Sequence, residues 1–363
     1  MLALSFAMLL AGHAYGWGSA GHSFLTLSSV QHLPAPLQTF VDRNFSTISE
    51  YATDEPLGRH YIDIDVYSEF FAGTMPRDLN VLYANYGTSF VNTNGISPWV
   101  IANYRATLTT QMSTARSTSD LELLARTAGE MAHYLEDINQ PLHTTDNYDG
   151  QQTGNSGIHS RYETTMVNRH FAGLAVAAAP ENCVYVTDTV DWVLNSIEDR
   201  TWDYVDDIMS ADTLARTFGS TSSNAYYNSL WNSTGAFTDS QFQLATEMVA
   251  SAWYSAWVDA GSPALSISGD YNNNGTVDAA DYIVWREAVG SSTVLPNDLT
   301  PGVDALDYNE WRARFGQSIV SGGASGAVVG SVPEPTTIVA LTASAIVVFC
   351  RAGRNRKCSI IHL

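Results

Sequence analysis

Basic side chains are scarce in this chain. Its 363 residues include 17 Lys and Arg against 37 Asp and Glu, so the formal net charge is −20. This balance excludes the basic surface with which proteins grip duplex nucleic acid. A polyanionic ligand would have to be held by bound metal cations instead, and otherwise the acidic composition serves only solubility. The length allows one large core with appended segments.

Cysteine and β-type patterning are also scarce. Cys183 lies in the main body of the chain, and Cys350 and Cys358 lie near its end. No disulfide framework can be built from these, so the cysteines do not indicate a compartment. Long alternation of apolar and polar residues is rare in residues 17–260. We therefore predict that this segment is a single all-α domain.

The N-terminus has the pattern of a secretory signal peptide. Residues 1–11 form a short apolar run, and Ala14 and Gly16 place small residues at the −3 and −1 positions of a cleavage site. A buried N-terminal helix is the alternative. Removal of residues 1–16 would make Trp17 the first residue of the mature protein.

Two segments have the apolar periodicity of amphipathic helices. The first covers residues 121–135, and Ser119 stands three positions before Glu122, as in a capping box. The second covers residues 239–258, whose Met and Trp side chains we expect in the core. Residues 144–157 are rich in Gly, Asn and Thr and predict a loop.

The densest group of chemically active side chains lies between residues 133 and 163. His133 and Asp137 are four positions apart, as are His159 and Glu163, so each pair would share one face of a helix. His143 lies between the two pairs. A histidine and a carboxylate presented together can bind one metal ion. Two ordinary surface pairs are the alternative, but three histidines in so short a stretch favour a metal site.

Further candidate ligands precede that stretch. Trp17 is followed five residues later by His22, and Asp54 and His60 lie close together. In this order, and with the stretch just described, the motifs of residues 17–260 resemble those of the zinc-dependent phospholipase C / S1/P1 nuclease superfamily. The resemblance implies an all-helical, secreted phosphodiesterase with three clustered zinc ions and a metal-bridging hydroxide as the nucleophile.

The resemblance also implies a ligand set for each zinc ion. The first ion would be bound by Asp54, His60, His133 and Asp137, the second by His143, His159 and Glu163, and the third by Asp137, His22 and the amino nitrogen and carbonyl of Trp17.

Two further side chains are candidates for the chemistry. Asp63 follows the ligand His60 by three positions and would either orient or protonate a leaving group or support a ligand. Asn155 is a partial substitute for a loop motif of the nucleases. Tyr61, Trp99 and Tyr148 are aromatic residues that would either stack on bases or pack in the core.

The choice between the two branches of the superfamily rests on a few positions. The short spacing from Trp17 to His22 is similar to the nucleases and favours single-stranded nucleic acid as the substrate. Glu163 stands where nucleases usually carry Asp, which is the phospholipase pattern and keeps a phospholipid substrate open. Glu136 stands where both branches usually carry Gly. An inactive metal-binding scaffold displayed on the cell surface is a third possibility.

An internal repeat follows a linker at residues 261–268. The segment 277–290 returns as 303–316 with the shared pattern Val-Asp-Ala-x-Asp-Tyr-x-x-Trp-Arg. The region 269–316 resembles the dockerin type I module, which implies a protein partner domain. A calcium loop is predicted in the first copy, with Gly275 at its sharp turn. Its ligands would be Asp270, Asn272, Asn274, Thr276, Asp278 and Asp281. The second copy lacks the early ligands, and an Asn-rich turn without metal is the alternative for the first.

The last part of the chain resembles a PEP-CTERM sorting tail. Residues 317–331 are rich in Gly, Ser and Ala and predict a flexible linker. Residues 332–363 contain Val-Pro-Glu-Pro, an apolar run and a basic end. The resemblance implies export in a Gram-negative bacterium, transient retention in the membrane by sorting machinery, and a periplasmic, cell-surface or extracellular location. A permanent anchor is the alternative, although the run is short for a stable span.

Overall fold

The regular structure of the chain is helical. A computed structural model describes residues 17–318 apart from 55–59, 116–117, 175–181, 264, 273, 294 and 299–301. Within these residues there is no strand, and the only β-type pairing is an isolated bridge between Thr276 and Ser318. The predicted all-α class is therefore confirmed for the part of the chain that the structure describes. The predicted signal segment 1–16 and sorting tail 332–363 lie outside it.

Longer helices form the body and the repeat region, and short helical turns connect them. The α-helices are α1 (Gly18–Ser29), α2 (Ala35–Ala52), α3 (Ser68–Phe71), α4 (Leu79–Tyr86), α5 (Thr88–Thr93), α6 (Ser97–Thr114), α7 (Thr118–Asp137), α8 (Ile158–Ser160), α9 (Val167–His170), α10 (Thr189–Ser196), α11 (Tyr204–Ala215), α12 (Asn224–Asp259), α13 (Ala279–Ala288) and α14 (Ala305–Arg314). The 3-10 turns are η1 (Val30–His32), η2 (Ile64–Val66), η3 (Pro141–Thr144) and η5 (Phe171–Gly173), and the π-helical segments are η4 (Arg161–Met166) and η6 (Ile197–Thr201).

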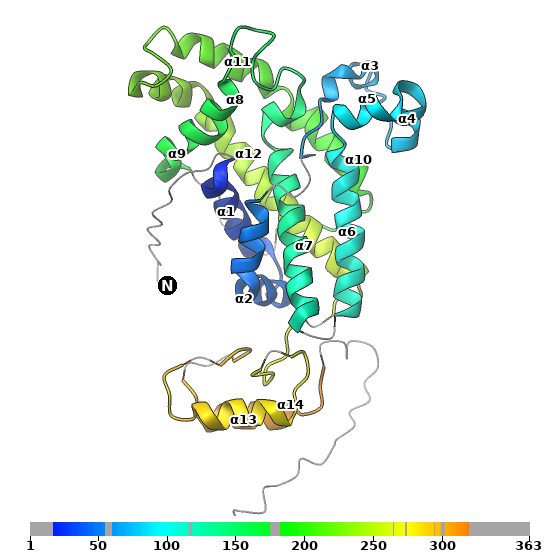
Figure 1. The fold of residues 1–363 in the computed structure, drawn as a ribbon, viewed down its shortest axis with the longest axis vertical. Helices are drawn as coiled ribbons and strands as arrows, with labels where there is room; N and C mark the ends of the chain where they lie inside the picture. Colours follow the sequence, from blue (N-terminus) through cyan, green and yellow to red (C-terminus); the bar gives the residue numbers. More distant parts are fainter. Residues whose placement is uncertain are drawn as a thin grey trace, which may run out of the picture. The chain divides into compact units, whose positions relative to one another are not determined.

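Helix α7 is at the centre of the body. It lies between α2 and α6 and also packs against α12 and α1 (Figure 1). Its apolar positions, including Leu124 and Leu135, are buried as their spacing predicts. Gly129 permits the close approach of α2, because a Cβ at this position would clash with the carbonyl oxygen of Ile48. The last turn of α7, which ends at Asp137, is thereby held inside the bundle.

Two helix boundaries differ from the predictions. Helix α7 begins at Thr118, so Ser119 lies inside the helix and not at its N-cap. Helix α12 begins at Asn224, well before residue 239, and the hydroxyl of Ser223 caps it by accepting a hydrogen bond from the Tyr226 N–H (3.2 Å). The helix is longer than predicted because Tyr226 and Leu230 in its early turns are also buried in the core.

The segment that carries His60 is fixed by backbone hydrogen bonds. The N–H of Ile62 donates to the carbonyl of His143 (2.9 Å), and the N–H of Asp63 donates to the carbonyl of Asn94 (2.7 Å). Gly95 has a φ of +83°, and a Cβ there would clash with the backbone of the same segment. The glycine thus lets an extended stretch pass close to the start of α6.

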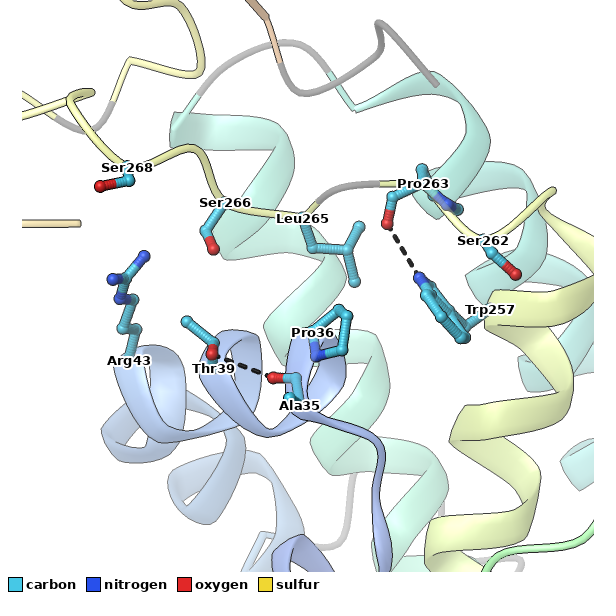
Figure 2. Close-up of a pocket in the computed structure, with 10 residues that line it drawn as sticks. All are labelled: Ala35, Pro36, Thr39, Arg43, Trp257, Ser262, Pro263, Leu265, Ser266 and Ser268. Atoms are coloured by element: carbon cyan, nitrogen blue, oxygen red, sulfur yellow. Dashed lines mark hydrogen bonds between the residues drawn. The ribbon is translucent and has the colours of Figure 1, made fainter. Parts of the chain in front are cut away.

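The linker after α12 folds back onto α2. The indole N–H of Trp257 donates to the carbonyl of Pro263 (2.8 Å), and a cavity of about 390 Å³ lies between the linker and the two helices (Figure 2). Small, apolar and serine side chains and Arg43 line this cavity. It shares no residue with the histidine cluster of the body.

The two copies of the repeat have the same local structure, and each donates a hydrogen bond to the other. Each begins with a capping box, formed by Asp278 with Asp281 on α13 and by Asp304 with Asp307 on α14. The indole N–H of Trp285 donates to the carbonyl of Asp304 (2.7 Å), and the equivalent indole in the second copy donates to the carbonyl of Asp278 (2.7 Å).

The described helices include none with the length and apolar character that a bilayer crossing needs.

Candidate metal centre

Five of the predicted histidines and two of the predicted carboxylates converge. They form three groups of three, and in each group one ligand atom per residue lies within 4.8 Å of the others. Asp137 belongs to two of the groups and His143 to two, so the groups form one continuous cluster. We call them the inner group (His22, His133, Asp137), the middle group (His60, Asp137, His143) and the outer group (His143, His159, Glu163).

The inner group is fully buried and joins α1 to α7. The Nε2 atoms of His22 and His133 lie 3.3 and 3.1 Å from the carboxylate oxygens of Asp137, and the two rings stack at 4.6 Å. Both Nε2 atoms and the Oδ1 atom of Asp137 are buried, and their close contacts with one another do not have hydrogen-bond geometry. Such atoms are costly to leave unpaired. A zinc ion bound to all three would satisfy them, so the donor set fits this metal.

The middle and outer groups are open on one side. The Nδ1 atom of His60 lies 2.6 Å from Asp137, and the Nε2 atoms of His143 and His159 lie 3.3 and 3.0 Å from Glu163. The side chains of His60 and His159 are 16% and 23% exposed, whereas the others are nearly or fully buried. A ligand would therefore reach the cluster beside these two histidines.

Charge and burial together shift the pKa values of the cluster. Burial alone would raise the pKa of Asp137, but the charges of the surrounding histidines hold it well below its usual range. Burial likewise opposes the shift at Glu163, yet the charge of His159 and the hydrogen bonds from His143 and His159 lower the pKa of Glu163 to about 2. For His159 itself, burial is outweighed by the charge of Glu163, which raises its pKa to about 9. The metal-free cluster is therefore a network of ion pairs.

Three histidines are oriented by an acceptor outside the cluster. The Nδ1 atom of His133 lies 3.0 Å from the carbonyl of Ala52, and that of His159 lies 3.1 Å from the carbonyl of Tyr148. The Nδ1 atom of His22 lies 2.6 Å from the carboxylate of Glu136. With the proton on Nδ1, each ring presents Nε2 to the carboxylate of its group. This is the arrangement that orients histidine ligands in metal sites.

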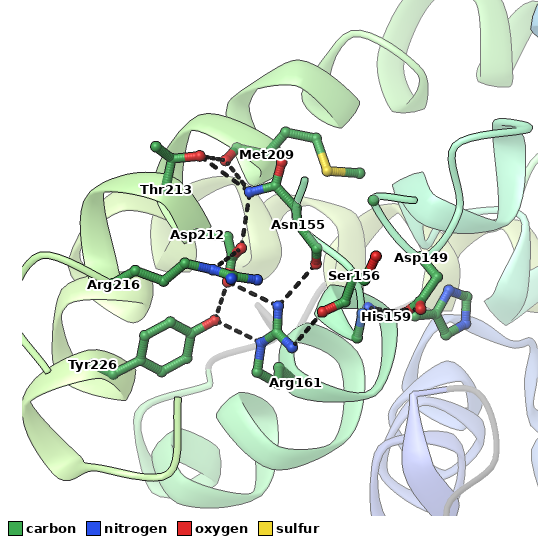
Figure 3. A network of polar contacts seen from close by, with 12 residues as sticks. Asp149, Asn155, Ser156, His159, Arg161, Met209, Asp212, Thr213, Arg216 and Tyr226 are labelled. Atoms are coloured by element: carbon green, nitrogen blue, oxygen red, sulfur yellow. Dashed lines mark hydrogen bonds and ion pairs between the residues drawn. The ribbon is translucent and has the colours of Figure 1, made fainter. Parts of the chain in front are cut away.

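A half-buried polar network holds the loop between His143 and His159 (Figure 3). The carboxylate of Asp149 accepts hydrogen bonds from the N–H groups of Gly157 (2.9 Å) and His159 (3.3 Å). Arg161, two positions later, donates to the carbonyl of Asn155 (2.9 Å) and to Asp212 on α11 (3.1 Å). The network ties the start of η4, and with it Glu163, to α11.

Four predicted site residues are not members of the three groups, which contain only His, Asp and Glu side chains. Asp54 is exposed and belongs to none of them. Trp17 is buried, and its indole N–H donates to the carbonyl oxygen of Glu136 (2.9 Å). The side-chain N–H₂ of Asn155 donates to Asp212 (2.8 Å), within the network of Figure 3. The fourth, Asp63, is buried; burial and then the charges of Asp146 and Asp65 raise its pKa to about 7.

The three groups of the structure overlap the ligand sets predicted for the three zinc ions, although their memberships are not identical. The set of His143, His159 and Glu163 is as expected, but His133 lies with His22, and His60 shares its group with His143. This partition depends on how α1 packs on α7, which local spacing does not specify.

Two supporting residues were not singled out from the sequence. The amide of Gln140 donates to the Glu163 carboxylate (2.8 Å), and the hydroxyl of Thr26 donates to Glu136 (2.8 Å). Two sequence signals were available. Gln140 lies between two ligands and directly before Pro141, and Thr26 follows His22 by four positions.

The predicted calcium loop is organised by its own side chains. Asp270 accepts hydrogen bonds from the N–H groups of Asn274 (3.0 Å) and Gly275 (2.8 Å), and Asp281 accepts one from Asn272 (2.9 Å). Both carboxylates are buried. Among the described residues, the loop does not form a further group of three close carboxylate or histidine ligands. Calcium binding stays a prediction.

Comparison with known proteins identifies no family. No protein-family model matches the chain, and no curated protein matches it. Among solved structures, an alpha toxin from Clostridium absonum is similar, with a TM-score of 0.41 and 14% sequence identity. The similarity covers 68% of this chain and 64% of the toxin chain, so the chain spans less than two thirds of the toxin's length. A likeness this low assigns neither a family nor an activity.

Proposed function

We propose that the protein is a zinc-dependent hydrolase of phosphodiester bonds, with single-stranded nucleic acid as its substrate. The observation that carries the proposal is the continuous cluster of three His and carboxylate groups, whose inner members are buried with unpaired ligand atoms. Zinc ions bound there would activate water near neutral pH and neutralise charge on a phosphate. The chain needs such cations, because its net charge of −20 opposes the binding of a polyanion.

The open side of the cluster supports a substrate that stacks on aromatic rings. Tyr148 is 50% exposed and meets His159 edge to face at 5.9 Å, and Tyr61 meets His60 in the same manner at 6.2 Å. Aromatic side chains beside a cation site can hold the bases of a single strand without a basic groove. Trp99, by contrast, is buried and donates to a backbone carbonyl, so it packs in the core.

Asp63 is the candidate for handling a proton. Its pKa of about 7 lets the carboxyl hold a proton at neutral pH. The hydrogen bond from Ile62 to the carbonyl of His143 keeps its segment beside the middle group. We propose that Asp63 supports the ligand His60, with orientation or protonation of a leaving group as its other role.

The test is hydrolysis of defined substrates by the chain that begins at Trp17. Single-stranded DNA and RNA should release nucleotides, and a chelator should abolish this release until zinc is restored. His143→Ala should be inactive, because His143 belongs to two groups, whereas His170→Gln should be unaffected, because His170 stacks on Trp231 outside the cluster. Diacylglycerol release from phosphatidylcholine would instead indicate a phospholipase. Zinc binding without any hydrolysis would overturn the proposal and favour the inactive metal-binding scaffold instead.

The motifs of residues 1–16 and 332–363 bear on where the protein is located. We propose export from a Gram-negative cell, directed by residues 1–16, and sorting through residues 332–363. The repeat at residues 269–316 would then be available to a partner domain. N-terminal sequencing of the exported protein should begin at Trp17, and an uncleaved N-terminus would contradict this proposal.

A further inference from the structure

One carboxylate beside the cluster belongs to none of its groups. Glu136 precedes the shared ligand Asp137 on α7, yet its side chain turns toward α1 and is fully buried. One oxygen lies 2.6 Å from Nδ1 of His22, and the other accepts a hydrogen bond from the hydroxyl of Thr26 (2.8 Å). The backbone carbonyl of the same residue accepts the indole N–H of Trp17 (2.9 Å). Residue 136 thus contacts three residues at the N-terminal end of the body.

The acceptor for His22 differs in kind from the acceptors for the other oriented histidines. His133 and His159 donate from Nδ1 to neutral backbone carbonyls, whereas His22 faces a carboxylate at a shorter distance. A charged acceptor gives a shorter and stronger hydrogen bond than a neutral one. It also raises the basicity of the opposite nitrogen, here Nε2, which is the atom that faces Asp137.

We propose that Glu136 is a positioning residue that fixes His22 as a zinc ligand and makes the inner group bind zinc more tightly than it otherwise would. The inference rests on the proposed function only in taking zinc as the metal. The carboxylate holds a proton of His22 on Nδ1, so the nitrogen that would bind zinc is Nε2, which lies 3.3 Å from Asp137. Thr26 holds the second carboxylate oxygen, which prevents Glu136 from turning into the cluster as a ligand.

The rival explanation is a purely structural pair that joins α1 to α7. Both explanations predict some loss of stability when Glu136 is changed, so stability alone does not separate them. The two explanations differ in the zinc affinity that they predict for the folded variant, because loss of a purely structural pair would leave the zinc ligands unchanged. The experiment therefore measures zinc binding and does not depend on hydrolysis.

The decisive variant is Glu136→Gln in the full chain. Glutamine keeps the size of the side chain and an oxygen that can accept from Nδ1, but it lacks the negative charge. We expect the binding of one zinc ion to weaken by about 10- to 100-fold, measured by competition with a chromophoric chelator. The remaining zinc binding should be unchanged. Cobalt substitution gives a second readout, since the visible spectrum of the ion in the inner group should change.

Two further variants keep the test sharp. Glu130→Gln removes another carboxylate of α7, one that pairs with Arg126 and belongs to none of the three groups. This variant should bind zinc as the wild type does. Thr26→Val removes the hydroxyl that holds Glu136 and keeps the shape of the side chain. It should weaken the binding of the same zinc ion by a smaller factor than Glu136→Gln does. If Glu136→Gln does not fold, the Thr26 variant decides the question.

The outcomes separate this inference from the proposed function. Equal zinc affinities of the wild type and Glu136→Gln would overturn the inference and leave the hydrolase proposal intact. A charge-dependent zinc affinity in a protein that hydrolyses no phosphodiester would support the inference and refute the hydrolase. A wild-type protein that binds no zinc would overturn both.

Discussion

At the scale of single residues, the cluster depends most on Asp137. It is the shared member of the inner and middle groups, and histidines surround it closely enough to hold its pKa well below the usual range. Asp137→Asn should lose zinc from both groups and lower hydrolysis by more than about 100-fold, above the loss typical of an outer-shell change. Zinc content and turnover measure this. Asp54→Asn is the comparison: a similar loss would make this exposed carboxylate a ligand, as the sequence predicts, and no loss would remove it from the site.

The ionic cluster also predicts how the zinc-free protein responds to pH. The pKa of Glu163 falls from 4.5 to about 2 on folding, so its contribution to stability is present above pH 4.5 and is lost as the pH falls toward 2. The pKa values of His22 and His159 rise from 6.5 to about 10 and about 9, because the charges of neighbouring carboxylates outweigh burial. Their contribution is complete below pH 6.5 and is lost as the pH rises through 9 and 10.

The zinc-free protein should therefore gain most from Glu163, His22 and His159 between pH 4.5 and 6.5. Urea unfolding with a chelator at pH 5.5, 7.5 and 9.5 should show a falling stability, with Glu163→Gln as a variant that weakens the effect. Zinc must displace the histidine protons, so its stabilising effect should instead grow over the same range. A zinc-free stability that does not change across this range would contradict the assigned ion pairs.

At the scale of elements, the outer group relies on the attachment of η4 to α11. Asp212 is buried and accepts hydrogen bonds from Arg161 (3.1 Å) and Arg216 (2.8 Å). Asp212→Asn would leave the half-buried guanidinium of Arg161 without its charge partner, and the loss of such a hydrogen-bond partner costs about 1–3 kcal/mol. We expect a loss of this order in chemical denaturation, together with weaker zinc binding at the outer group. Asp207→Asn, an exposed change on the same helix, should do neither.

The same elements show how far local sequence patterns specify the site. The spacing of four residues placed His133 with Asp137 and His159 with Glu163, because a helical turn is a local property. Which ligands share a group depends on the packing of α1 on α7, and no local pattern contains that information. The turn toward α1 that gives Glu136 its contact with His22 has the same origin.

At the scale of the whole molecule, negatively charged side chains are concentrated at two places where cations could bind. The body concentrates carboxylates and histidines in one mostly buried cluster, and the repeat buries Asp270 and Asp281 at the predicted calcium loop. The chain has few basic residues with which to compensate these charges. Bound cations would do so at both places, which connects the acidic composition with the motifs.

The two copies of the repeat provide a matched test of calcium binding. Asp281 and Asp307 occupy equivalent positions, and each accepts a hydrogen bond from the N–H of its N-cap residue at 2.7 Å. Only Asp281 belongs to a loop with the early ligands, so calcium should raise the unfolding temperature of the wild type and of Asp307→Asn but not of Asp281→Asn. At a calcium concentration 100 times the Kd, the stabilisation should be about 2.7 kcal/mol. Calorimetry with calcium and with a calcium-selective chelator measures the difference. Equal unfolding temperatures of the wild type in both conditions would show that the loop is an Asn-rich turn held by its own hydrogen bonds.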